Sequence, residues 1–215
     1  MKLIKNALKK SFLYPLYIKT KSWQSEVNRL DKRRGPSIDK YLPKGGIGAE
    51  LGVFKGHFSK VLLNRTKPKQ LHLIDPWYFL EANWLWASGN KSTVDALCNV
   101  LQYNKKEINE KVIFVHVQDD IKVLKDFPDE HFDWVYIDSS HAYDHTVTEL
   151  ELLTKKVKSS GIICGHDWQP DVNHRHHGVY KAVNEFLVKN SYKLIYADDE
   201  SFQWFIKKRT DYLNK

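Results

Sequence analysis

The chain has 215 residues, of which 42% are hydrophobic and 13% aromatic, and its formal net charge is +8. This length suits one domain with a sizeable core, and the composition excludes a disordered chain. No apolar run approaches the roughly 18–20 residues that a membrane-spanning helix needs. The two cysteines, Cys98 and Cys164, fall in different predicted elements, so we expect no disulfide framework and a reducing, cytoplasmic location.

The positive charge is compatible with two classes of partner, nucleic acid and an anionic membrane surface. Lysines are nevertheless spread along the whole chain, with modest clusters only at 2–21 and 207–209. A diffuse basic surface favours a role in solubility over recognition. We therefore expect a small-molecule substrate, with nucleic acid as the less favoured partner.

The first 44 residues are predicted to form an N-terminal helical extension. Residues 2–14 place apolar side chains at helical spacing, with lysines on the rest of the wheel, which indicates a basic amphipathic helix. Residues 1–21 could contact a membrane surface, pack on a second subunit in a homo-oligomer, or cover one edge of the domain. Pro15 is predicted to end this helix, and Gly35-Pro36 to end a second helix over 22–34.

From residue 45 to residue 215 the pattern alternates between strands and helices. The strands are expected at 47–51, 71–74, 112–117, 132–137, 161–164, 193–196 and 202–206. The helices between them are expected at 58–64, 93–108, 120–125, 143–157 and 179–189. This alternation predicts an α/β fold of the Rossmann-like, doubly wound kind, with a mostly parallel seven-stranded sheet. The short turn at 198–200 predicts an antiparallel hairpin of the last two strands at one edge.

The first predicted strand runs into a glycine turn, A-E-L-G-V-F-K-G-H-F-S, over residues 49–59. Glu50 closes the strand, while Gly52 and Gly56 allow the backbone to approach a ligand and leave helix N–H groups free. The turn lacks both the G-K-[ST] ending of a phosphate-binding loop and the G-x-G-x-x-G spacing of a dinucleotide site. By itself it is also compatible with an ordinary strand-to-helix turn.

The second and third strands also end on polar side chains. Asp75 follows the second strand, where a carboxylate can accept hydrogen bonds from ribose hydroxyls. Gln118, Asp119 and Asp120 follow the third, where a side-chain acceptor can bind the exocyclic amine of adenine. A helix N-cap is the alternative role for each acid. Three consecutive strands that end this way favour one shared nucleoside ligand.

The fourth and fifth strands bring acids and imidazoles. Asp138 ends the fourth strand with His141 three residues later, and His166 and Asp167 follow the fifth. Because ligands of open parallel sheets bind beyond the carboxyl ends of the strands, these four side chains are expected to meet. Such a group indicates a metal and proton-transfer site. A helix cap at Asp138 and a surface imidazole at His141 are the alternative.

Taken together, the motifs E-L-G-V-F-K-G, L-I-D-P-W, Q-D-D and Y-I-D-S-S-H-A-Y resemble those of class I S-adenosylmethionine-dependent methyltransferases, over roughly residues 45–207. The resemblance implies that the cofactor is S-adenosylmethionine. It further implies cofactor-binding roles for Glu50, Gly52, Gly56, Asp75, Gln118 and Asp119. The glycine turn departs from the commoner form of the motif, since Val53 and Phe54 stand where small residues are frequent.

The later motifs are most similar to the metal-dependent branch of macrolide-sugar O-methyltransferases and cephalosporin-hydroxylase-like proteins. This similarity implies a divalent cation, magnesium or manganese, held by Asp138, His166 and Asp167, with Asp138 and His141 as catalytic residues and His141 as general base. His166 stands where many relatives carry glutamate, and imidazole favours manganese, iron or zinc over magnesium. The implied reaction is O-methyl transfer to a hydroxyl of a small polar acceptor, a sugar or polyol.

Two other functions stay open at this point. One is a non-catalytic module that binds S-adenosylmethionine, and the other, less favoured, is a nucleic-acid methyltransferase. The chain lacks the N-P-P-Y-type sequence of amino-methylating enzymes. Acceptor choice is expected to reside in residues 1–44, 77–92 and 168–178, the last of which carries His174, His176 and His177. The aromatic residues at 77–90 could form a lid over the substrate or serve in packing.

Overall fold

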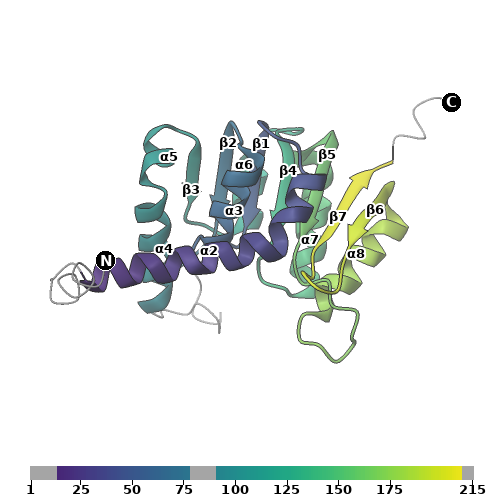
Figure 1. Cartoon of the computed structure of the whole chain (residues 1–215). Helices are drawn as coiled ribbons and strands as arrows, with labels where there is room; N and C mark the ends of the chain where they lie inside the picture. Colours follow the sequence, from purple (N-terminus) through teal and green to yellow (C-terminus); the bar gives the residue numbers. More distant parts are fainter. Residues whose placement is uncertain (1–13, 78–90, 210–215) are drawn as a thin grey trace.

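The computed structural model describes residues 14–77 and 91–209 (Figure 1). The helices are α2 (Tyr14–Tyr41), α3 (His57–Thr66), α4 (Lys91–Tyr103), α5 (Lys105–Asn109), α6 (Asp120–Asp126), α7 (Tyr143–Lys156) and α8 (His177–Lys189). The strands are β1 (Ile47–Leu51), β2 (Gln70–Ile74), β3 (Ile113–His116), β4 (Phe132–Ile137), β5 (Val157–Gly165), β6 (Tyr192–Ala197) and β7 (Trp204–Lys208).

The seven strands form one sheet in the order β3-β2-β1-β4-β5-β7-β6. The first five strands in this order are parallel, and β7 is antiparallel to both β5 and β6. The predicted α/β fold, mostly parallel with an antiparallel edge pair, is therefore confirmed. The chain changes direction across the sheet between β1 and β4, which is the point where ligands of such sheets bind.

Helices cover both faces of the sheet. On one face α2, α3 and α4 bury side chains against the strands, including Val27, Ile38, Leu62 and Val100. On the other face α6, α7 and α8 contribute the second cluster of buried side chains. Figure 1 shows α2, in purple, running across the first face beside α3. The segment expected to be an extension thus shares its core with the sheet.

The predicted end of a helix at Gly35-Pro36 is wrong, because α2 continues through Pro36 to Tyr41. Proline removes one N–H from the helical ladder. Burial of Ile38, which has no exposed surface, and of Leu42 favours the continued helix. The Ser37 hydroxyl also donates to the carbonyl of Arg34 (2.8 Å). Pro15 lies in the first turn of α2, a position that tolerates proline. Whether it ends a helix over 2–14 concerns residues outside the described part of the chain.

The long helix expected over 93–108 is divided at Asn104 into α4 and α5. The Asn104 side-chain amide donates to the carbonyl of Val100 (2.9 Å). This bond gives a hydrogen-bond partner to one of the carbonyl groups in the last turn of α4. The predicted amphipathic helix at 2–14, apart from its last residue, and the lid at 77–90, apart from Trp77, lie outside the described residues. Among the helices that the structure describes, none is long and apolar enough to cross a bilayer.

Candidate active site

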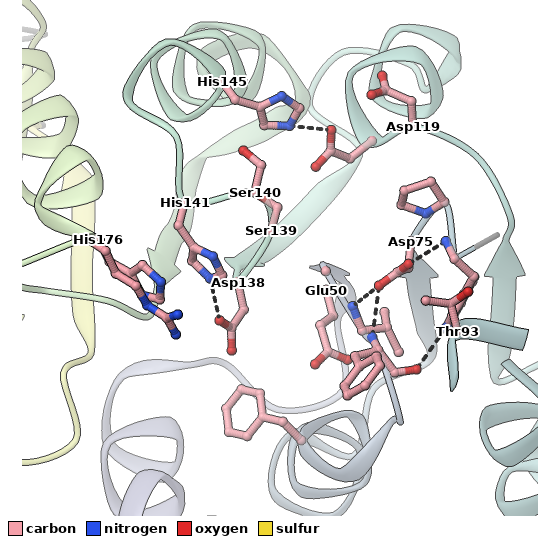
Figure 2. A pocket seen from close by; sticks show the side chains of 18 residues that line it. Glu50, Asp75, Thr93, Asp119, Asp138, Ser139, Ser140, His141, His145 and His176 are labelled. Carbon is pink, nitrogen blue, oxygen red and sulfur yellow. Dashed lines mark hydrogen bonds and ion pairs between the residues drawn. The ribbon is translucent and has the colours of Figure 1, made fainter. Parts of the chain in front are cut away.

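A cavity of about 430 Å³ opens at the carboxyl ends of β1, β2 and β4 (Figure 2). Its volume lies in the range of cavities that hold small molecules and cofactors. Of the ten residues predicted to be catalytic or to bind cofactor or metal, six line it: Glu50, Gly52, Asp75, Asp119, Asp138 and His141. The other four predicted residues do not: Gly56, Gln118, His166 and Asp167. The cavity thus joins the predicted nucleoside end to the predicted chemical end.

Gly52 makes the close approach between the β1 turn and β4 possible. Its φ is +82°, and a Cβ atom there would lie 2.2 Å from the carbonyl oxygen of Asp138. A side chain would therefore face both an unfavourable backbone conformation and a clash with main-chain atoms. The glycine allows the turn to lie directly against the backbone that carries Asp138.

Asp75 holds the glycine turn in place. One carboxylate oxygen accepts hydrogen bonds from the N–H groups of Val53 and Phe54, both at 2.9 Å, and the other accepts from the N–H of Trp77 at 2.6 Å (Figure 2). Burial raises the pKa of Asp75, and these three hydrogen bonds oppose the shift. The predicted ribose-binding carboxylate therefore also organises the loop that would surround the cofactor.

Glu50 lies at the base of the cavity and is 1% exposed. The Ser59 hydroxyl, from the first turn of α3, donates to its carboxylate. Burial raises the pKa of Glu50 well above its usual range, although the bond from Ser59 opposes this shift. A protonated Glu50 presents an O–H donor and a carbonyl acceptor to the cavity.

Gln118 and Asp119 are both engaged with the backbone. The Gln118 side-chain oxygen accepts from the N–H of Asp119 (2.9 Å). Asp119 is the N-cap of α6 and accepts from the N–H of Lys122 (3.1 Å), so the capping role considered for this acid is present. Asp119 nevertheless lines the cavity, whereas Gln118 does not.

Asp138 and Asp167 lie side by side at the ends of β4 and β5, as the parallel pairing of these strands predicts. Asp138 Oδ1 is 3.3 Å from His141 Nε2 and 3.6 Å from His166 Nδ1. Its other oxygen, Oδ2, accepts a hydrogen bond from Arg34 Nη1 at 2.9 Å. The carboxylate thus divides its contacts between imidazoles on one side and a guanidinium on the other.

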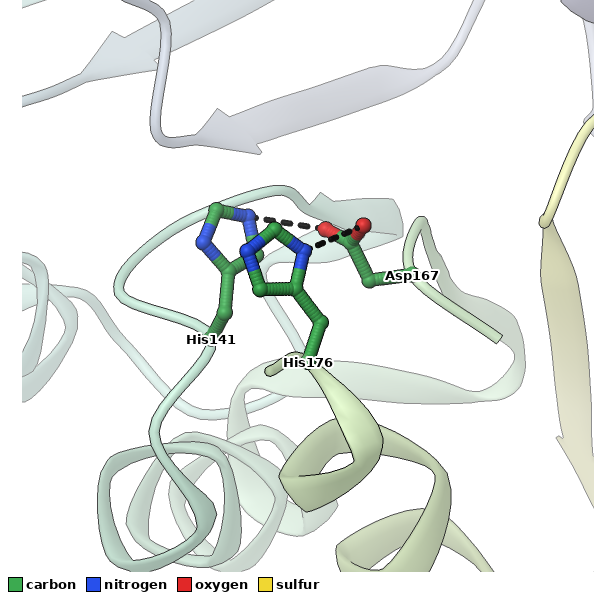
Figure 3. A group of neighbouring side chains, drawn as sticks. All are labelled: His141, Asp167 and His176. Atoms are coloured by element: carbon green, nitrogen blue, oxygen red, sulfur yellow. Dashed lines mark hydrogen bonds and ion pairs between the residues drawn. The ribbon is translucent and has the colours of Figure 1, made fainter. Parts of the chain in front are cut away.

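Asp167 is 5% exposed and faces three imidazoles. Its Oδ1 lies 2.8 Å from His176 Nδ1 and 3.2 Å from His166 Nδ1, and its Oδ2 lies 2.8 Å from His141 Nε2. Figure 3 shows His141 and His176 side by side against this carboxylate. Their rings are parallel within 9°, with centroids 4.3 Å apart.

These contacts set the protonation of the group. Burial alone would lower the pKa of His141, but the carboxylates of Asp138 and Asp167 raise it to about 9. Burial would raise the pKa of both acids, but the surrounding imidazoles, and Arg34 at Asp138, hold it well below the usual range. Both carboxylates are therefore ionised at neutral pH, and His141 carries a proton between them.

The predicted metal ligands fit a cation. Asp138, His166 and Asp167 each offer one donor atom, and these atoms lie within 4.8 Å of one another. His141, Asp167 and His176 form a second such set, which shares Asp167 with the first. Carboxylate oxygens and imidazole nitrogens are the ligands that divalent metals take in proteins.

Arg34 is a site residue that sequence reasoning missed. It comes from α2, is 8% exposed, and places its guanidinium 4.9 Å from the centre of the Phe58 ring as well as against Asp138. Burial would lower its pKa, but Tyr136 and Asp138 raise it, so it carries a positive charge. No sequence motif marked it among the many basic residues of the first 44.

A second polar group contributes Asp120, Ser139 and His145 to the cavity lining, and of its members sequence reasoning named only Asp120. His145 Nε2 is 2.8 Å from Asp120 Oδ1 and 3.8 Å from Glu149 Oε1, and the Ser139 hydroxyl donates to Glu149 (2.6 Å). Burial, and then the charge of Asp120, raise the pKa of Glu149 well above its usual range. The spacing of His145 and Glu149 along α7 could have indicated a shared face, but their contact with Asp120 depends on the fold.

The comparisons with solved structures show the same fold at low identity. A candidate methyltransferase from Streptococcus mutans, solved in complex with SAH, is 12% identical, with a TM-score of 0.55 over 81% of this chain and 95% of that chain. A candidate S-adenosylmethionine-dependent methyltransferase from Methanococcus maripaludis is 14% identical, with a TM-score of 0.58 over 86% of this chain and 88% of that chain. A Corynebacterium glutamicum protein is 8% identical, with a TM-score of 0.60 over 86% and 89%.

Among curated sequences no protein matches the chain. A family model described as a methyltransferase domain matches residues 49–168, which is more than half of the chain. The matched range begins in β1, includes the glycine turn and Asp138, and ends one residue after Asp167. The chain therefore belongs to this methyltransferase-domain family.

Proposed function

We propose that the protein is an S-adenosylmethionine-dependent O-methyltransferase that acts, with a divalent cation, on a hydroxyl of a small polar acceptor, a sugar or polyol. The observation that carries this proposal is one continuous cavity, lined at one end by the glycine turn and Asp75 and at the other by Asp138 and His141. Membership of the methyltransferase family supports the reaction class. The SAH found in the Streptococcus mutans structure supports the cofactor.

At the nucleoside end of the cavity, the residues of this chain would bind and orient S-adenosylmethionine. The glycine turn offers a close backbone, and Asp75 fixes that turn through Val53 and Phe54 while its remaining lone pairs can accept from ribose. Asp119 borders the cavity where an adenine amine would lie. When bound, S-adenosylmethionine supplies a methyl group on a positively charged sulfur.

At the chemical end, the acceptor oxygen forms a bond to the methyl carbon while the sulfur–carbon bond breaks, and the hydroxyl loses its proton. Asp138, His166 and Asp167 would hold the cation, which lowers the pKa of a bound hydroxyl. His141 would accept the proton at Nε2, the atom that faces both carboxylates. This role requires that the negative charge of Asp138 and Asp167, which keeps a proton on His141, be offset in the loaded enzyme.

The remaining expectations concern partners. A cavity of this size suits a small acceptor better than a folded nucleic acid, and we keep residues 1–21 as a candidate contact with a membrane or a second subunit. We also keep residues 45–215 as the methyltransferase domain. Within that assignment, α2 is a component of the active site, since Arg34 contacts Asp138.

The test incubates the protein with S-adenosylmethionine, Mn²⁺ and a panel of sugars and polyols, and measures the products by mass spectrometry. We expect one added methyl group on an acceptor oxygen, and loss of product in Asp138→Asn or with a chelator. Asp129→Asn, an exposed aspartate paired with Lys156, is the matched control and should keep full activity. Full activity of Asp138→Asn, or cofactor binding with no turnover on any acceptor, would contradict the proposal.

A further inference from the structure

Two imidazoles meet one carboxylate oxygen at the end of β5. His166 Nδ1 and His176 Nδ1 lie 3.2 Å and 2.8 Å from Asp167 Oδ1, whereas His141 faces the other oxygen. Asp138 Oδ1 approaches His166 Nδ1 from the side of β4, at 3.6 Å. One carboxylate oxygen each of Asp138 and Asp167 and the Nδ1 atoms of His166 and His176 therefore lie at this strand end, where Asp167 is common to two sets of three possible metal ligands. Figure 3 shows the set of His141, Asp167 and His176.

The loop before α8 fixes the position of His176. The N–H of His176 donates to His174 Nδ1 (3.2 Å), and the N–H of His177 donates to the carbonyl of His174 (2.9 Å). The His177 ring contacts the carbonyl of Gln169 through Nδ1 (3.0 Å), which ties the same loop to the segment that follows Asp167. His176 is therefore directed at Asp167 by a set of local hydrogen bonds.

The charge of this group is low for magnesium. Asp138 and Asp167 supply two negative charges, and Arg34 offsets one of them through its bond to Asp138. Mg²⁺ prefers oxygen ligands in octahedral geometry and relies on charged carboxylates or phosphates. Imidazole nitrogens instead suit zinc, iron, cobalt and related ions, whose affinity for nitrogen is higher.

We propose that Asp138, His166, Asp167 and His176 form a two-nitrogen, two-oxygen site for a first-row transition-metal ion, and that Mg²⁺ binds there only weakly. The inference rests on the proposed function, because it names the ion that the proposed reaction would use. It leaves His141, which lines the cavity and stacks on His176, outside this set of four ligands. His176 is then a ligand delivered by the loop before α8.

The test measures metal binding directly, without S-adenosylmethionine or acceptor. Full-length protein is stripped with a chelator and titrated by calorimetry with Co²⁺, Zn²⁺ and Mg²⁺, and the visible absorption of bound Co²⁺ reports its ligands. We expect one ion per chain, with Co²⁺ and Zn²⁺ binding at least roughly tenfold more tightly than Mg²⁺. Equal or tighter binding of Mg²⁺, or no binding of any ion, overturns the proposal.

Variants assign the fourth ligand. His176→Ala should weaken Co²⁺ binding by about tenfold or more and alter the visible spectrum. His131→Ala, a histidine that packs on Phe127 and Phe132 at the opposite end of β4, should leave both unchanged. Thermal unfolding of the metal-free variants checks that each is folded, and Co²⁺ spectra of His166→Ala provide a second ligand test. An unchanged Co²⁺ affinity and spectrum in His176→Ala would contradict the assignment.

The two proposals fail in different ways. If Co²⁺ binds as described but no acceptor is methylated, the proposed function is wrong and the metal site stands. If methyl transfer occurs at full rate in chelator and no ion binds, the metal site and the cation of the proposed reaction are both wrong, and S-adenosylmethionine-dependent methyl transfer stands.

Discussion

Arg34 and Asp138 lie 104 positions apart in the chain, and their side chains form a hydrogen-bonded ion pair of 2.9 Å inside the active site. The pair joins α2 to the end of β4. Their side chains are only 10% and 21% exposed, so little water can replace either partner. The first helix is therefore joined electrostatically to the residue on which the proposed chemistry depends.

Removal of the Arg34 guanidinium should lower the free energy of unfolding. Arg34→Ala leaves the Asp138 carboxylate without its strongest positive neighbour from α2, and we expect a loss of about 3 kcal/mol in the free energy of unfolding. Arg29→Ala is the control on the same helix, because Arg29 pairs with Glu26 at an exposed site and should change stability by less than about 1 kcal/mol. Urea unfolding of both variants measures the difference, and equal effects would show that the buried pair contributes nothing special.

Gly52 offers a test of the turn under the cavity. Gly52→Ala combines a positive φ with a backbone clash, so we expect a loss of more than about 2 kcal/mol and loss of SAH binding. Gly45 has a similar φ of +79°, but a Cβ there meets nothing within 4 Å. Gly45→Ala should thus cost only about 1 kcal/mol and retain binding. Thermal unfolding and calorimetry with SAH compare the two variants. Equal losses of stability and of SAH binding in Gly52→Ala and Gly45→Ala would show that the clash of residue 52 with the Asp138 backbone is not the cause.

Acid stability should depend on an imidazole cluster, His72, His116 and His131, whose members do not line the cavity. His72 Nδ1 lies 3.0 Å from His116 Nε2, and burial, with the charges of His116 and His131, lowers the pKa of His72 to about 4. In the unfolded chain the ordinary pKa is 6.5, so the unfolded state binds this proton first as the pH falls. The folded state therefore loses up to about 3 kcal/mol between pH 6.5 and pH 4 relative to a variant without the imidazole.

His72→Phe is that variant, since Phe114 already stacks on this ring with centroids 5.1 Å apart. Urea unfolding of both proteins at several pH values gives the difference in stability. We expect the wild type to lose stability relative to His72→Phe through this window, with a constant difference above pH 7. Parallel curves from pH 7 to pH 4 would show that His72 is charged in the folded protein.

Glu149 tests whether a buried carboxyl is neutral. Its pKa is raised well above the usual range, and it accepts from Ser139 while lying 0% exposed. Glu149→Gln keeps the shape, the acceptor and a donor, so it should change the free energy of unfolding by less than about 1 kcal/mol. Glu149→Ala removes all three and should cost about 3 kcal/mol. A large loss in Glu149→Gln would mean that Glu149 is ionised.

The sequence predicted the meeting of Asp138, His166 and Asp167, because neighbouring parallel strands place their carboxyl ends together. It could not predict Arg34, whose position depends on how α2 crosses the sheet rather than on any local pattern. The prediction that a helix ends at Pro36 is wrong because the burial of Ile38 outweighs one missing hydrogen bond, and burial is a tertiary property. The local rules thus placed the strand ends, whereas the contacts across elements had to come from the structure.

The backbone contacts of Asp75 show a second limit. A carboxylate after β2 was expected to face a ribose, but it also accepts from three N–H groups of neighbouring loops. A carboxylate has enough lone pairs for both tasks, so residue type and position alone cannot separate them.

We expect one cavity to bind the methyl donor at the β1 turn and a cation between Asp138 and Asp167. A crystal structure of the protein soaked with SAH and Co²⁺, with an anomalous difference map, would locate both. We expect SAH along Gly52 and Asp75, with its sulfur toward Asp138, and one anomalous peak within coordination distance of Asp138 and Asp167. SAH bound elsewhere, or a map without a peak between these two carboxylates, would contradict the account.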